Sequence, residues 1–576
     1  MSRYLRLFLL TLTACLLCTS VPTDGLSVHL LTAPLLTAFL VSWPTGFLPS
    51  RARTATQLLF GEAVLVLCAI DCYCQIFFLV PLNAKLFSTI LLTDMRETRE
   101  FLRVFLGWQV LHQWRLAALL LLALLYPLSF FLKPSFPFKP RTTCRLRVAG
   151  GLLLALCIVC EAPAAYRYLQ LFSPGADLQL TEGLIFRHYH EEVPTPLHRF
   201  AYAWRASRLS ARTQTAIRRA TLEATVDSCS YRSPHIVFVI GESYNKHHST
   251  LYGYHLPTTP LQQRRADSGE LYVFTDVVSP WNITSNAFLS FFSLWEHGAA
   301  QPAECYPLFP ALFRKAGYEV RFFSNQYVTQ GLIRSSTSQA GHFFLSDRQL
   351  CRQMFSFRNE RTRSYDTGLL SQVRHFRADN PTAPHTLDII HLIGQHFDYA
   401  ERYPQMEARF KPADYADRAL DGEARRVLMH YDNATHFDDV VLDRLLSLYE
   451  ADEAVVVFVA DHGEEVYDDL PVHGRLFSAP TPSQARQEFE VPMWVWCSPA
   501  YRERHPEVLQ RLEASLHKPF MTDGLPQLFL WLAGIYSRWN DDARNLLSTQ
   551  YECKPRFIAG DTDYDHICSV KSTPSN

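Results

Sequence analysis

The chain has 576 residues and a formal net charge of −1. That length exceeds one ordinary domain, and the near-neutral charge balance argues against a nucleic-acid-binding protein. Hydrophobic residues make up 48% of the chain and concentrate in residues 1–165, whereas the remainder has the mixed composition of a globular domain. We therefore expect a helical membrane part followed by a large folded part.

Five apolar segments occupy the first part, each close to the ~20 residues that cross a bilayer. They cover residues 5–20, 27–48, 57–80, 115–133 and 146–163. Basic residues precede the first segment and occupy the connections between the second and third and between the fourth and fifth. The positive-inside rule places these stretches in the cytoplasm, so the chain after the fifth span is expected outside it.

Two stretches of this part need their own interpretation. The first segment also has the pattern of a signal peptide, and Leu12-Thr13-Ala14-Cys15 has the form of a lipoprotein cleavage site. The regular alternation of loop charges favours a retained helix instead. The long connection predicts an amphipathic helix near residues 85–112 that lies on the outer membrane surface.

The chain contains 14 cysteines. Those within or beside the apolar part have an ordinary explanation as small packing residues. Those outside it show no Cys-x-x-Cys pair, which argues against a cysteine zinc cluster. Because an oxidising compartment permits disulfides, we expect the bridges Cys305–Cys351 and Cys553–Cys568.

The remainder of the chain divides in two. Residues 166–232 predict a bridging helical segment, and from residue 233 to 576 short apolar runs alternate with helical patterns. That alternation indicates an α/β domain with a mostly parallel sheet. We expect strands at residues 235–240, 318–323, 387–393, 454–460 and 491–497.

Three of these strands end at side chains that can bind a metal ion, namely Glu242, His396 and Asp461 with His462. Ligands of open α/β sheets gather at the carboxyl ends of the strands, and carboxylates with histidine suit Zn²⁺. Each residue alone is more often a helix cap or an ordinary surface or core residue. Their joint position at separate strand ends is what predicts a metal site.

A hydroxyl nucleophile is expected in the run from Val277 to Ser285. A serine or threonine that begins a helix would face amides that stabilise a phosphoryl group, and a metal would activate it. The spacing leaves Ser279, Thr284 and Ser285 open. Plain helix capping is the alternative, and Asn282-Ile283-Thr284 is also a formal glycosylation sequon.

A series of short motifs runs along the chain in a fixed order. They are Gly241-Glu242-Ser243, Leu251-Tyr252-Gly253-Tyr254, Thr258-Thr259-Pro260, His391-Leu392-Ile393-Gly394-Gln395-His396, Arg402-Tyr403-Pro404, Tyr431-Asp432-Asn433, Asp461-His462-Gly463-Glu464 and Val472-His473-Gly474. Together with the five spans, they resemble the phosphoethanolamine transferase family of the alkaline phosphatase and sulfatase superfamily. The resemblance covers nearly the whole chain.

This resemblance implies a bacterial inner-membrane enzyme with a periplasmic catalytic domain. It would transfer phosphoethanolamine from phosphatidylethanolamine to lipopolysaccharide or another envelope glycan or lipid. Glu242, Asp461 and His462 would hold one zinc ion, with Thr284 as the further ligand and the residue that becomes phosphothreonine. A second zinc is compatible with the pattern.

The resemblance also implies roles around this centre. His396 and His473 would bind the phosphate, take the acceptor's proton or hold a second zinc, and Glu97 would meet the ethanolamine ammonium at the membrane surface. The loop before Thr284 departs from the Cys-Gly-Thr-x-Thr of the lipid A branch, because Asn282 falls on one alignment of the nucleophile. Which acceptor is used therefore stays open.

Three alternatives share parts of this pattern. A sulfatase needs a C/S-x-P-x-R box, which the chain lacks, and a phosphodiesterase would use the same fold. A glycerol-phosphate transferase has the same five-span layout but resembles these motifs less. A catalytically silent membrane relative is disfavoured by the intact Glu242, Asp461 and His462.

Overall fold

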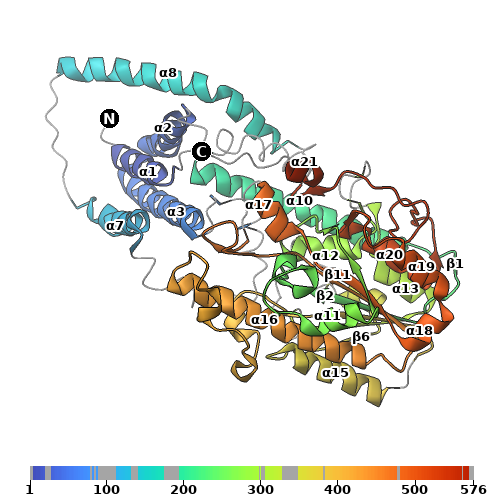
Figure 1. Cartoon of the computed structure of the whole chain (residues 1–576). Helices are drawn as coiled ribbons and strands as arrows, with labels where there is room; N and C mark the ends of the chain where they lie inside the picture. The colour runs from blue at the N-terminus through green and yellow to red at the C-terminus, as the bar shows by residue number, and fades with distance from the viewer. Residues whose placement is uncertain are drawn as a thin grey trace. The chain divides into compact units, whose positions relative to one another are not determined.

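Figure 1 shows a computed structural model of the chain. It describes residues 4–19, 28–77, 81–82, 86–87, 112–131, 140–173, 194–296, 299, 305–326, 345, 348–380, 383–475, 480–560 and 562–569. The chain forms two compact units, Met1–Ser210 and a second made of Ala211–Arg475 with Ala479–Asn576.

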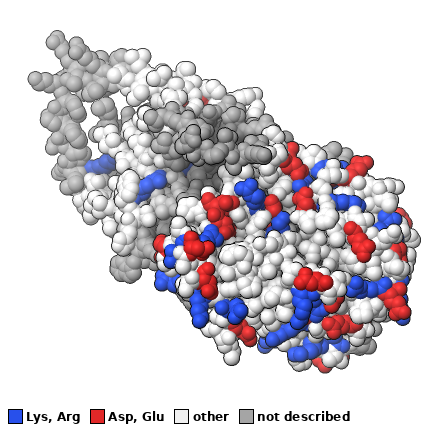
Figure 2. Space-filling view, in the orientation of Figure 1, with Lys and Arg blue, Asp and Glu red and all other residues white. Residues whose placement is uncertain are grey.

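The first unit is built from apolar helices. They are α1 (Leu5–Leu17), α2 (His29–Ser42), α3 (Ser50–Phe77), α7 (Trp114–Leu128) and α8 (Pro140–Gln170). By length and composition, three stretches can each cross a membrane: His29–Phe47, Ser50–Phe77 and Ala149–Gln170. Few charged side chains show on its described helices in Figure 2, in contrast to the second unit.

These helices lie where the apolar segments predicted them, so a multi-span helical membrane part is confirmed. α10 (Pro196–Glu223) falls within the predicted bridging segment. The predicted amphipathic helix and Glu97 lie outside the described residues, apart from a few positions at the ends of that stretch.

The second unit is an α/β domain around a seven-stranded sheet in the order β3-β11-β8-β2-β7-β5-β6. The strands are β2 (His235–Gly241), β3 (Leu271–Phe274), β5 (Glu319–Ser324), β6 (Phe357–Arg358), β7 (Thr386–His391), β8 (Ala454–Ala460) and β11 (Met493–Cys497). β8, β2, β7, β5 and β6 pair in parallel, and β11 runs antiparallel to its neighbours. The mostly parallel sheet is confirmed.

Helices cover both faces of this sheet. In Figure 1, α11 (Pro260–Asp267), α15 (Asp366–Asp379) and α16 (Gly422–Ser447) lie on one face, and α12 (Thr284–Phe292), α13 (Phe309–Ala316) and α20 (Leu525–Ala533) on the other. The central strands are fully buried, because both faces are covered. This explains why they are unbroken runs such as Ala454–Ala460 rather than alternating ones.

The two disulfides expected from the cysteine count are wrong. Cys305, Cys351, Cys553 and Cys568 are free thiols in the structure, and Cys305 and Cys553 are exposed. Cys351 lies in α14 (Arg348–Met354), where Arg358 Nη1 approaches its sulfur at 3.6 Å.

One buried ion pair crosses the sheet between β5 and β7. Arg321 stands opposite Asp388 in the strand register, and its Nη2 donates to Asp388 Oδ2 at 2.8 Å. The Tyr449 hydroxyl donates to the same oxygen at 2.7 Å. Both charges are removed from water, so the loss of either partner would leave the other uncompensated.

Replacing Asp388 by alanine is therefore expected to lower the free energy of unfolding by about 3–5 kcal/mol. Chemical denaturation of the full chain in detergent, followed by tryptophan fluorescence, measures the change. The matched control is Arg219→Ala: its pair with Glu223 lies on a helix surface and should contribute less than about 0.5 kcal/mol. An Asp388→Ala protein as stable as the control would contradict the expectation.

Candidate metal centre and active site

Glu242 and Asp461 lie side by side because two neighbouring strands end at the same edge of the sheet. β2 and β8 pair in parallel with Gly241 opposite Ala460, so the next residue of each strand brings its carboxylate to this edge. Both side chains are fully buried. His391 ends β7, the neighbour of β2 on its other side.

The backbone turns sharply after Glu242. Ser243 has a left-handed φ of 54°, a strained conformation for a residue other than glycine. Its amide donates to Asp461 Oδ1 at 3.0 Å, and the Tyr431 hydroxyl of α16 donates to its carbonyl at 2.7 Å. These bonds fix the direction in which Glu242 leaves the strand.

The loop after β7 requires a glycine where it passes Glu242. Gly394 has a φ of 42°, and a Cβ there would lie 3.0 Å from the Glu242 carbonyl oxygen. The Asp366 carboxylate accepts hydrogen bonds from the amides of Ile393 and Gly394, both at 3.0 Å. Asp366 therefore holds this loop against the metal-binding edge.

Three lone-pair atoms converge at the edge. His462 Nε2 lies 3.6 Å from Glu242 Oε1 and 3.3 Å from Asp461 Oδ2. His462 Nδ1 lies 2.7 Å from the Gly463 carbonyl, which can only accept, so the proton is on Nδ1 and the lone pair on Nε2. Among the described residues, Asp461 Oδ2 has no hydrogen-bond partner.

This donor set fits a divalent cation. One ligand atom from each of Glu242, Asp461 and His462 lies within 4.8 Å of the others. Burial, followed by the charge of Glu242, raises the pKa of Asp461 well above its usual range, so the two carboxylates repel each other in the absence of a cation. Burial lowers the pKa of His462 to about 3, which keeps the imidazole neutral as a metal ligand must be.

Thr284 begins α12 beside these atoms. Its hydroxyl oxygen lies 3.1 and 3.2 Å from the two carboxylate oxygens of Glu242 and 3.3 Å from His462 Nε2. The amino end of the helix, with its unpaired amides, faces the same region. The structure thus brings Glu242, Thr284, Asp461 and His462 together, and the part each plays stays a prediction.

The competing positions of the nucleophile loop point elsewhere. Ser279 donates its hydroxyl to the Asp461 carbonyl at 2.6 Å, which is a structural bond. Asn282 Nδ2 donates to Glu488 at 2.6 Å. The side chain of Ser285 lies outside the described residues.

The two further predicted histidines lie beside this centre. His396 is close enough for its charge to act on Glu242, and burial lowers its pKa to about 4. His473 begins β10 (His473–Gly474) and packs against Tyr399 and Tyr467, at centroid distances of 6.1 and 5.6 Å. Neither belongs to the described three-residue group, and their roles stay predictions.

The sequence did not single out two side chains of the site. Gln326 Nε2 donates to Glu242 Oε2 at 2.8 Å and to the Leu392 carbonyl at 3.0 Å. Arg475 Nη1 donates to His462 Nε2 at 2.9 Å, and its Nε lies 3.5 Å from a Glu464 oxygen. Arg475 could have been found, because it directly follows the His473-Gly474 motif.

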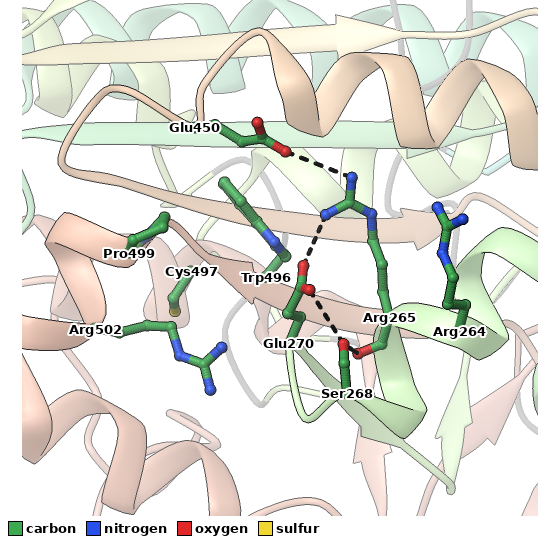
Figure 3. A pocket seen from close by; sticks show the side chains of 9 residues that line it. All are labelled: Arg264, Arg265, Ser268, Glu270, Glu450, Trp496, Cys497, Pro499 and Arg502. Carbon is green, nitrogen blue, oxygen red and sulfur yellow. Dashed lines mark hydrogen bonds and ion pairs between the residues drawn. The ribbon is translucent and has the colours of Figure 1, made fainter.

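A pocket of about 520 Å³ lies at the opposite edge of the sheet (Figure 3). It is lined partly by Trp496 and by Cys497, which pairs with Val455 near the start of β8. Its Arg265 is already bound at 2.7 Å by Glu270 and by Asp443. The pocket is therefore separate from the metal centre, and this guanidinium is neutralised.

Comparison with known proteins agrees with this geometry. The family model described as Sulfatase matches residues 234–525, just over half of the chain. The chain belongs to the sulfatase family. The matched region contains every described residue of the metal centre, from Glu242 to Arg475.

Within the sulfatase family, the chain is similar to curated phosphoethanolamine transferases. EptC of Escherichia coli (strain K12) is 27% identical over 331 residues, which are 56% of this chain and 55% of that protein. EptA of Helicobacter pylori is 26% identical over 274 residues, or 47% of this chain and 49% of that protein. The matches span about half the length of these relatives.

Solved structures show the same architecture. The C-terminal periplasmic domain of Escherichia coli EptC in complex with Zn has a TM-score of 0.51 and 25% identity, over 60% of this chain and 96% of that domain. The integral membrane protein EptA of Neisseria meningitidis has a TM-score of 0.60 at 18% identity, over 94% and 96% of the two chains. The sulfatase-family fold and the helical membrane part therefore occur together in a known protein.

A buried ion network fastens the hairpin that carries His473 and Arg475. His248 Nδ1 lies 2.6 Å from Asp432 and its Nε2 lies 2.9 Å from Asp468, which sits between β9 (Glu465–Val466) and β10. Burial alone would lower the pKa of His248, but the charges of Asp468 and Asp432 raise it to about 10. The protonated imidazole thus joins two carboxylates of separate segments.

This network predicts a pH dependence of stability. Because the folded pKa lies above the ordinary 6.5, its stabilisation is complete below about pH 6.5 and is lost as the pH rises through about 10. We expect the free energy of unfolding to fall by a few kcal/mol over that range, and to fall less in His248→Gln. Urea denaturation at a series of pH values measures both slopes. The exposed His375→Gln should keep the wild-type slope, and equal slopes in all three proteins would contradict the expectation.

Proposed function

We propose that this chain transfers phosphoethanolamine from phosphatidylethanolamine to a lipopolysaccharide or other envelope acceptor, through a phosphothreonine at Thr284. The observation that carries the proposal is the hydroxyl of Thr284, 3.1 Å from a buried carboxylate at a helix amino end. The relatives named phosphoethanolamine transferases supply the transferred group. The same resemblance supports an inner membrane with the catalytic domain on its periplasmic side.

The donor atoms support zinc as the cofactor. Glu242, Asp461, His462 and the Thr284 hydroxyl would hold it, and the EptC domain was solved in complex with Zn. When bound there, zinc would lower the pKa of the threonine hydroxyl and offset negative charge on the phosphoryl oxygens. A second ion near His396 and His473 would be compatible with their positions.

The first step would move phosphoethanolamine onto the protein. Thr284 Oγ1 attacks the phosphorus of the donor lipid, and the bond from phosphorus to the diacylglycerol oxygen breaks. The Glu242 carboxylate is placed to take the threonine proton, which ends on the departing diacylglycerol. The amides at the start of α12 and the Arg475 guanidinium are placed to stabilise the charge on the phosphoryl oxygens.

The second step would return the threonine. A hydroxyl or phosphate oxygen of the acceptor attacks the phosphorus, the bond to Thr284 Oγ1 breaks, and the threonine regains a proton. His396 and His473 are candidates to bind the phosphate or to take the acceptor's proton. Membrane helices suit a lipid donor, and Glu97 remains the proposed contact for its ammonium group.

Thr284→Ala is expected to abolish a covalent phosphoethanolamine adduct on the protein, since it removes the attacking oxygen. Intact-mass and peptide-mapping spectrometry after incubation with phosphatidylethanolamine measures the adduct. Thr284→Ser should retain it at a lower rate, and Ser279→Ala tests the neighbouring hydroxyl, which is bonded to the Asp461 carbonyl. An adduct that persists in Thr284→Ala and disappears in Ser279→Ala would move the nucleophile.

Arg475→Met is expected to keep bound zinc while slowing adduct formation by about 10- to 100-fold, because it removes a charge that stabilises the phosphoryl group and no metal ligand. Metal analysis by mass spectrometry and the adduct time course are measured on the same sample. Glu242→Gln is the comparison, since it should lose zinc and adduct together. Zinc loss in Arg475→Met would show that the guanidinium supports the metal site instead.

A further inference from the structure

Four cysteines meet between two helices of the membrane part. Cys15 lies in α1 and Cys18 directly follows it, and Cys68 and Cys72 lie in α3. Each is at most 1% exposed, and all belong to one apolar cluster. Cys18 Sγ also lies 3.2 Å from the Cys68 carbonyl oxygen. We call these four residues the thiol seam.

Sulfur contacts within the thiol seam are pairwise. The Cys68 thiol is in hydrogen-bond contact with those of Cys15 and Cys18, and Cys18 is also in contact with Cys72. Among these contacts, one pairing uses all four residues: Cys15 with Cys68 and Cys18 with Cys72.

Helix geometry agrees with this pairing. The spacings of three residues on α1 and four on α3 each correspond to one turn. Further back along both helices, a Cβ at Gly61 would come within 2.9 Å of Leu10, so the two helices run in the same direction. Successive turns therefore present successive pairs.

Packing and metal binding explain less. Small residues let membrane helices approach closely, but that does not require the thiols to touch one another. A thiolate metal centre needs three or four sulfur atoms around one point. Among the described residues, the group that brings three ligand atoms within 4.8 Å is Glu242, Asp461 and His462, not the thiol seam.

We propose that the thiol seam closes into two disulfide bonds, Cys15–Cys68 and Cys18–Cys72, which tie α1 to α3. The structure has the reduced form, with the thiols in contact. In forming each bond, two thiols lose two protons and two electrons, and a disulfide of another protein accepts them and becomes two thiols.

The predicted orientation supplies the oxidising side. The loop charges place the end of α1 and the end of α3 outside the cytoplasm, and Cys18 and Cys72 lie next to those ends. Since the finished seam is buried, exchange takes place while the helices associate. The bonds make α1 a permanent part of the membrane unit, and they do not depend on the transferase activity.

Peptide mapping of the full chain tests this proposal. Membranes are dissolved in sodium dodecyl sulfate with N-ethylmaleimide, and the protein is digested with trypsin without reductant. Trypsin leaves Cys15 and Cys18 in residues 7–51 and the cysteines of α3 in residues 54–85. We expect these two peptides to be linked and to separate on reduction.

Cys74 is the internal control, because it lies in α3 and is 2% exposed but belongs to a different cluster. It should be the alkylated cysteine of the linked pair, and Cys74→Ser should keep both links. In Cys72→Ser, Cys18 should become alkylated while Cys15–Cys68 still joins the peptides. Alkylation of every seam thiol in the unreduced wild type would overturn the proposal, as would a lipid-bearing amino terminus at Cys15.

Discussion

Two buried carboxylates at the ends of neighbouring parallel strands are the constraint on which the rest of the domain depends. Glu242 and Asp461 cannot both be charged there without compensation, and their position is fixed by the pairing of β2 with β8. The surrounding structure answers this constraint in two ways. Neutral imidazole and cationic guanidinium groups lie against the carboxylates, and a strained turn at Ser243 keeps them from moving apart.

The same confinement links fold to chemistry. Because α12 begins beside Glu242, the Thr284 hydroxyl, a proton acceptor and a helix amino end meet without any long loop to order. The residues that support them come from distant segments: Asp366 holds the Gly394 loop, and His248 holds the hairpin of Arg475. The reactive groups are thus positioned by elements that do not react, as preorganised catalysis requires.

Much of this arrangement could be predicted from the sequence because buried parallel strands are unbroken apolar runs that stop at a polar residue. The positions of Glu242 and Asp461 follow from that pattern, and those of the membrane helices follow from hydrophobic length. Spacing could not separate Thr284 from Ser279, because the choice depends on which hydroxyl the backbone already uses. Gln326 reaches the centre through tertiary folding, and the outer disulfides failed because an even number of cysteines does not say which loops meet.

The most direct test of this account is anomalous diffraction at the zinc edge from crystals of the protein grown with zinc. The account predicts a peak bonded by Glu242, Asp461, His462 and the Thr284 hydroxyl, at the roughly 2.0–2.2 Å expected of zinc with oxygen and nitrogen ligands. In that structure, Arg475 would no longer donate to His462 Nε2. A zinc ion bound elsewhere, with the Arg475 bond to His462 intact, would contradict it.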